Sequence, residues 1–190
     1  MFKPYIDRLD IKVMVRDAAK KIATIMSERG NQKTAFVCLL RGGIYYFTDL
    51  TRELGKYHIT DITLEFLRVS SYTSNGEAGK VNIQGDIEQF AGMDVWLVDE
   101  IIDSGNTMIE LCKAFRSLPK EKQPSGLFVT SLLCRASFTG SEKMNTLMET
   151  PIQGFVSPGR IDSDNWLMGY GMEDNGHNRN LPDIWIQYND

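Results

Sequence analysis

Short apolar runs alternate with helical patterns through most of the chain, and this alternation limits the possible folds more than any other feature. Runs rich in strand-forming residues cover 34–40, 94–98 and 125–134, and residues 62–66 place apolar side chains at every second position. Elsewhere apolar residues recur at helical spacings of three and four: Ile11, Val15, Ala18, Ile22 and Ile25, then Met108, Leu111 and Phe115. Strands that alternate with helices predict an α/β fold, a mainly parallel sheet with helices on both faces.

The sequence also predicts where helices begin and end, a long loop and a small C-terminal lobe. Gly30 predicts the end of the first helix, and residues 44–54 are predicted to form a helix after the sequence RGG. The polar, glycine-containing stretch 73–86 predicts a loop or a flexible hairpin of the kind that acts as a lid. From about Pro151 the apolar pieces become short and are separated by Gly, Pro, Asn and Asp, which predicts a small C-terminal lobe.

Composition excludes several classes of protein. A net charge of -4 argues against a general nucleic-acid binder, which needs a basic face for phosphates. The three cysteines lie in or beside apolar stretches, so we expect buried thiols in a reducing compartment. The sequence contains no Cys-x-x-Cys pattern, so a zinc site is not expected. No apolar run has the length of a membrane span and the N-terminus lacks an apolar signal segment, so we expect a soluble cytoplasmic protein.

Residues 95–108, VWLVDEIIDSGNTM, predict an anion site between a strand and a helix. Helix N-termini present unpaired N–H groups and a partial positive charge, which suits phosphate. Gly105 allows a close approach of the backbone, and the hydroxyls of Ser104 and Thr107 add donors. The motifs G-x-x-x-x-G-K-[ST] and G-x-G-x-x-G are missing from the sequence, so neither a P-loop NTPase nor a Rossmann dinucleotide site is supported.

Three carboxylates accompany this turn. Asp99 and Glu100 are suited to accept hydrogen bonds from the vicinal hydroxyls of a sugar or to lie near a metal, and Asp103 is expected to face the reacting centre. These residues predict a phosphorylated sugar with free hydroxyls and a magnesium ion as the ligand. The alternative is an acidic strand end followed by a capped helix.

The same segment closely resembles the phosphoribosyl diphosphate (PRPP) binding motif of type I phosphoribosyltransferases, and an aspartate at position 103 is typical of the enzymes that act on 6-oxopurines. Three more stretches resemble hypoxanthine-guanine phosphoribosyltransferases in the same order. They are LLRGG at 39–43, like the pyrophosphate loop, LRVSSY at 67–72, like the start of the mobile loop, and NWLMGYGMEDNGHNRNLPDIWI at 165–186, like the purine-binding segment.

This resemblance implies a fold, an activity and an assembly. It implies one phosphoribosyltransferase domain over residues 1–190, with about 151–190 contributing a purine-binding hood. The implied reaction is purine salvage, in which PRPP and hypoxanthine or guanine give a nucleoside monophosphate and pyrophosphate with Mg²⁺ as cofactor. A homodimer or homotetramer is implied, and a membrane or nucleic-acid partner is not.

The resemblance also implies roles for individual residues. Asp103 would be the general base or acid at the purine N7, Trp166 would stack on the purine, and the loop at 40–42 would contain a non-proline cis peptide bond. Residues expected to contact PRPP are Leu40, Arg41, Gly42, Ser71, Tyr72, Asp99, Glu100, Asp103, Ser104, Gly105, Asn106, Thr107 and Arg179. Those expected to contact the purine are Arg135, Trp166, Leu167 and Glu173, and those expected near Mg²⁺ are Asp99, Glu100 and Glu173.

The sequence shows four departures from the family pattern. Arg135 and Arg41 replace lysines, Glu173 replaces an aspartate, and Asp99 and Glu100 invert the common Glu-Asp order. The sign of the charge is kept at each position, so we expect activity, while a planar guanidinium in place of an ammonium puts the choice of base in question. Two alternatives stay open: a xanthine-preferring transferase, and a regulator of the same fold that binds PRPP.

Overall fold

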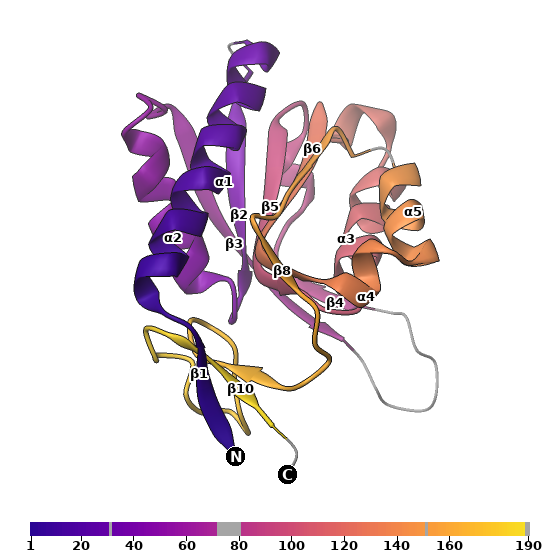
Figure 1. Ribbon diagram of the computed structural model, residues 1–190. Coiled ribbons are helices and arrows are strands. Elements are labelled where there is room, and N and C mark those ends of the chain that lie inside the picture. The colour runs from indigo at the N-terminus through magenta and orange to yellow at the C-terminus, as the bar shows by residue number, and fades with distance from the viewer. Residues whose placement is uncertain (31, 72–80, 151, 189–190) are drawn as a thin grey trace.

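The computed structural model describes residues 1–30, 32–71, 81–150 and 152–188, and its centre is a twisted sheet between two layers of helices (Figure 1). The predicted loop at 73–86 lies mostly outside the described residues, as does Tyr72. Among the described residues, no helix combines the length and the apolar character that a bilayer span requires.

The main sheet has the order β4-β3-β2-β5-β6-β7, with β8 also paired to β6. The pairs β2–β3, β2–β5, β5–β6, β6–β7 and β6–β8 are parallel, and β3–β4 is antiparallel. This confirms the predicted α/β fold with a mainly parallel sheet. The strands are β2 (Thr34–Leu40), β3 (Ile62–Ser71), β4 (Val81–Gln84), β5 (Asp94–Ile102), β6 (Gly126–Arg135), β7 (Gly154–Val156) and β8 (Gly159–Ile161).

Helices cover both faces of this sheet (Figure 1). On β2, the side chains of Phe36 and Cys38 belong to a core shared with α1 and α2, while those of Val37 and Leu39 belong to a second core shared with α3 and α5. A buried strand is therefore apolar on both faces, which explains its continuous apolar run. The helices are α1 (Arg8–Arg29), α2 (Ile44–Gly55), α3 (Asn106–Ser117), α4 (Ala136–Thr139) and α5 (Glu142–Glu149), with short 3₁₀ turns η1 (Glu88–Phe90) and η2 (Lys120–Lys122).

The first helix follows from its sequence. The side chain of Asp7 accepts hydrogen bonds from the backbone N–H groups of Leu9 and Asp10 and so caps the N-terminus of α1. The predicted apolar stripe faces the core, and Gly30 ends the helix with a positive φ of 72°. The predicted stripe and stop of α1 are confirmed, and the structure adds the cap at Asp7.

A second, smaller sheet joins the two ends of the chain and forms a hood over one end of the main sheet (Figure 1). It consists of β1 (Phe2–Ile6), β10 (Ile184–Gln187) and β9 (Leu167–Met168), all antiparallel. The sequence pattern did not indicate β1, because its five residues form a strand by pairing with a partner at the other end of the chain. Residues 1 and 188, the two ends of the described part of the chain, lie close together: the amino group of Met1 donates to the carbonyl of Tyr188 at 2.8 Å.

Two strands differ in detail from the sequence expectation. β5 continues to Ile102, so Asp99 and Glu100 lie in the strand and the turn begins only at Asp103. On β3, the alternating residues Leu64 and Phe66 are 45% and 50% exposed, although their periodicity is that of an apolar face. Residues 81–84 are the second arm of a hairpin with β3, which was one of the two forms expected for this region.

Candidate active site

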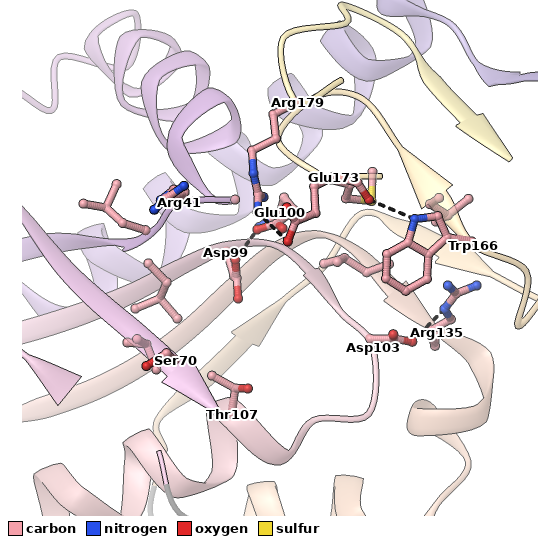
Figure 2. Close-up of a pocket in the computed structure, with 17 residues that line it drawn as sticks. Arg41, Ser70, Asp99, Glu100, Asp103, Thr107, Arg135, Trp166, Glu173 and Arg179 are labelled. Atoms are coloured by element: carbon pink, nitrogen blue, oxygen red, sulfur yellow. Dashed lines mark hydrogen bonds and ion pairs between the residues drawn. The ribbon is translucent and has the colours of Figure 1, made fainter. Parts of the chain in front are cut away.

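A cavity of about 410 Å³ lies at the carboxyl ends of β2, β3 and β5, between the main sheet and the hood (Figure 2). In parallel sheets this edge is where ligands bind. Its lining includes twelve of the residues that the sequence predicted: Leu40, Arg41, Gly42, Asp99, Glu100, Asp103, Thr107, Arg135, Trp166, Leu167, Glu173 and Arg179. It also includes five that were not predicted: Leu39, Val69, Ser70, Ile101 and Met172.

Among the other predicted residues, those that the structure describes do not line this cavity. Ser104 and Gly105 line a smaller adjoining cavity of about 100 Å³ at the start of α3. Asn106 is the first residue of α3 and lines neither cavity. Ser71 ends β3, and its side chain and Tyr72 fall outside the part of the chain that the structure describes.

The turn between β5 and α3 has the geometry of an anion site. Gly105 has a φ of 76°, and a Cβ atom there would lie 2.1 Å from Cε2 of Phe138. Only glycine satisfies both constraints, so this residue brings the backbone N–H groups at the start of α3 to the cavity. Thr107, in the first turn of the helix, lines both cavities.

Asp99 and Glu100 form an acidic pair at the end of β5. Burial, together with the neighbouring charge of Glu100, holds the pKa of Asp99 well above its usual range. The Oε2 atom of Glu100 is buried and has no hydrogen-bond partner among the described residues. Two adjacent, buried carboxylates with an unpaired oxygen fit a divalent cation. Such a cation prefers carboxylate oxygens and fills its coordination shell from substrate and water. No cluster of three or more metal-binding side chains occurs in the described ranges.

The loop between β2 and α2 is packed tightly from two sides. The peptide bond between Leu40 and Arg41 is cis, as the resemblance implied. A Cβ atom on Gly42 would lie 1.8 Å from Oε1 of Glu100, and a Cβ atom on Gly171 would lie 2.0 Å from the carbonyl oxygen of Gly42. The loop is therefore held between the acidic pair and the hood, and its position depends on both.

The hood presents a cation and an aromatic face to the cavity (Figure 2). Arg179 donates from Nη1 to the carbonyl of Gly171 at 2.6 Å, and its Nη2 lies 2.9 Å from Oε1 of Glu173. Trp166 donates from Nε1 to the carbonyl of Glu173 at 2.8 Å and is 51% exposed. This hydrogen bond fixes the ring while its surface remains accessible, which suits stacking on a planar ligand.

Arg135 lies at the opposite corner of the cavity from the loop, beside Asp103 (Figure 2). Its Nε donates to Oδ1 of Asp103 at 2.8 Å. The Arg135 side chain is 5% exposed and the Asp103 side chain is 67% exposed. A buried cation thus fixes one carboxylate oxygen of Asp103, while the carboxylate itself faces the cavity.

Little or nothing in the sequence indicated the cavity-lining residues that were not predicted. Val69 and Ser70 directly precede Ser71, which was predicted. The end of β3 was therefore located, but the residues of this strand that line the cavity begin two positions before the predicted one. Met172 follows the GYG sequence; it is 6% exposed and also lines the cavity. Tyr170 donates to Oδ2 of Asp49 at 2.7 Å and so ties the hood to α2, a contact across 121 residues with no local signature.

Comparison with known proteins identifies the class. Residues 7–121, more than half of the chain, match the phosphoribosyl transferase domain family, and the chain belongs to that family. It is also similar to the hypoxanthine-guanine phosphoribosyltransferases of Rattus norvegicus, with 28% identity, and Homo sapiens, with 26% identity, each over 181 residues. Both alignments cover 91% of this chain and 77% of the relative.

Solved structures show the same fold. A hypoxanthine phosphoribosyl transferase of Trypanosoma cruzi superposes with a TM-score of 0.81 at 22% identity, covering 98% of this chain and 91% of the other. A hypoxanthine phosphoribosyltransferase of Staphylococcus aureus gives a TM-score of 0.77 at 21% identity, with the same coverage of both chains. The predicted fold of a type I phosphoribosyltransferase is confirmed.

Proposed function

We propose that this protein transfers the 5-phosphoribosyl group of PRPP to a 6-oxopurine, hypoxanthine or guanine, and releases pyrophosphate. The observation that carries the proposal is the position of Asp103, which shares one cavity with the exposed face of Trp166 and with the acidic pair Asp99–Glu100. A base and a phosphorylated sugar bound at these two ends would meet beside this carboxylate. The names of the similar relatives support the choice of base.

The residues divide the work of binding. The purine would stack on Trp166, and the 5′-phosphate would accept hydrogen bonds from the N–H groups at the start of α3. The side chains of Arg41 and Arg179 would balance the charge of the departing pyrophosphate. Positioning two reactants in this way supplies much of the rate enhancement, because it replaces an encounter in solution by a fixed geometry.

The chemical step needs one proton acceptor. The bond between N9 of the base and C1′ of the ribose forms while the bond between C1′ and the pyrophosphate oxygen breaks. The proton on N7 of the base passes to the carboxylate of Asp103, which is exposed toward the cavity and oriented by Arg135. A positioned general base typically contributes about 10²–10⁴-fold to the rate.

A divalent ion fits the acidic pair. Asp99 and Glu100 would hold magnesium, and Glu173, which lines the same cavity, would be close to it. The buried and unpaired Oε2 of Glu100 supports this assignment. Magnesium would neutralise the oxygens of pyrophosphate as they gain charge.

The test is a magnesium-dependent assay of nucleotide formation from PRPP with hypoxanthine, guanine, xanthine or adenine. We expect turnover with hypoxanthine or guanine, and a loss of about 10²–10⁴-fold in kcat for Asp103→Asn. Asp162→Asn is the matched control, because Asp162 is an exposed aspartate that also accepts from an arginine Nε, that of Arg160 at 3.0 Å, and does not line the cavity. Binding of PRPP without turnover of any base would overturn the proposal in favour of a regulator.

A further inference from the structure

Arg135 connects three separate segments of the chain. It ends β6, and its Nε donates to Asp103 in the turn that precedes α3. Its Nη1 donates to the carbonyl of Ser163, and its Nη2 donates to the carbonyl of Asn165 at 2.9 Å. All three guanidinium nitrogens therefore have protein acceptors.

The two carbonyl acceptors belong to residues 163–165, which we call the strap. The strap leads directly into Trp166, whose indole faces the cavity. Asp103 and Trp166 are thus held to one rigid group, because the guanidinium is planar and its donors have a fixed spacing. The charge of Arg135 is buried and has Asp103 as its counter-ion, so it is not left uncompensated.

We propose that Arg135 is a positioning residue that sets the distance between the carboxylate of Asp103 and the ring of Trp166 by anchoring the strap. This inference rests on the proposed function, because it concerns where the base sits relative to its proton acceptor. It differs from direct contact with the purine, which the resemblance implied for this position. A guanidinium has five N–H donors, and three of them are used within the protein.

Lysine at position 135 cannot reproduce this arrangement. An ammonium carries three donors on one nitrogen, whereas the three acceptors here are spread around a planar fork. Lysine would keep the charge beside Asp103 and would leave at least one of the two strap carbonyls unpaired. The strap would then lose a bond to the rigid guanidinium, so it would move and Trp166 would move with it.

The experiment compares Arg135→Lys and Arg135→Ala with the wild type. The first readout is the fluorescence of Trp166 without substrate, obtained as the difference from the same protein carrying Trp166→Phe, since Trp96 and Trp185 also emit. The second is kcat and KM for the base. For Arg135→Lys we expect a red-shifted Trp166 emission, a fall in kcat of about tenfold or more and a rise in KM for the base.

Chemical rescue separates shape from charge. Guanidinium at millimolar concentration should restore part of the rate and the emission of Arg135→Ala, while methylammonium at the same concentration should not. Arg160→Lys is the matched control, because Arg160 also donates from Nε to an aspartate but is exposed and lies outside the cavity. Asp103→Asn should lose kcat and keep the wild-type emission, because the bonds from Arg135 to the strap remain.

Wild-type emission, kcat and KM in Arg135→Lys would overturn the proposal, since a point charge would then suffice. A change in base selectivity with unchanged emission would also overturn it and would favour direct reading of the base. If Arg135→Ala does not fold, Arg135→Lys and Asp103→Asn carry the same test. Because the emission is measured without substrate, a shifted emission in a protein that turns over no purine would refute the proposed function and leave the anchoring of the strap standing.

Discussion

The Glu173 carboxylate and the Arg179 guanidinium form an ion pair inside the cavity, with Nη2 2.9 Å from Oε1. Arg179 is also proposed to bind pyrophosphate, and Glu173 is proposed to lie close to magnesium. The carboxylate therefore competes with an incoming anion for the arginine. Without metal, Glu173→Gln should bind pyrophosphate several-fold more tightly, as measured by calorimetry in the presence of a chelator.

The control for this prediction is Glu110→Gln. Glu110 forms an ion pair of the same length, 2.9 Å, with Lys113 on α3 and does not line the cavity. This variant should bind pyrophosphate as the wild type does. Unchanged or weaker binding in Glu173→Gln would show that the pair does not restrain Arg179.

Gly42 should tolerate no side chain. A methyl group there would overlap the carboxylate of Glu100 at 1.8 Å, so either the loop or the acidic pair must move. We expect Gly42→Ala to lose at least about tenfold in kcat/KM for PRPP, because a displacement of about 1 Å at a reacting centre has effects of about 10²-fold. Gly55→Ala is the control: nothing lies within 4 Å of its Cβ position, and kinetics should not change. Wild-type kinetics in Gly42→Ala would mean that Glu100 is not needed in its present place.

The cap of α1 should give a pH-dependent contribution to stability. Hydrogen bonds from the backbone N–H groups of Asp10 and Leu9 hold the pKa of Asp7 below its usual value. The stabilisation is present above the pKa that Asp7 has in the unfolded chain. It is lost as pH falls through the lower pKa that Asp7 has in the folded protein. Asp7→Ala should lower Tm by about 2–4 °C at neutral pH, and the difference should shrink in acid.

Asp7→Asn is the informative partner of that variant. Asparagine is a good capping residue that does not ionise, so its Tm at neutral pH should be close to that of the wild type. Calorimetry at several pH values tests both. A difference between Asp7→Ala and the wild type that stays constant down to the acid range would refute the link to ionisation.

The three thiols should be unreactive in the folded protein. Burial raises the pKa of Cys38 and Cys112 to about 12 and that of Cys134 to about 11, and the thiolate is the reactive form. Alkylation by iodoacetamide near neutral pH should be slower than that of free cysteine by at least about 10²-fold, since the free thiol has a pKa of about 8.5. Mass spectrometry measures the labelling, and unfolding in urea should restore it. Fast labelling of any of the three in the native state would contradict the burial described here.

The sequence alone determined the four central strands of the main sheet and the place of the turn between β5 and α3. The strand at 34–40, the helix stripe from Ile11 and the turn at Gly105 are local patterns, because burial on both faces, helical spacing and a left-handed turn each leave a mark within a few residues. The resemblance extended this to the site, and twelve of the predicted residues line one cavity.

Only the tertiary structure decided which partners these residues have. β1 is a strand because β10 pairs with it from the far end of the chain, and Leu64 and Phe66 are exposed although their spacing is that of an apolar face. Arg135 looked like a reader of the base and is bonded to Asp103 and to the strap. The physical reason is the same in each case: hydrogen bonds and ion pairs between segments far apart in the chain depend on how the segments pack, and no local pattern records that packing.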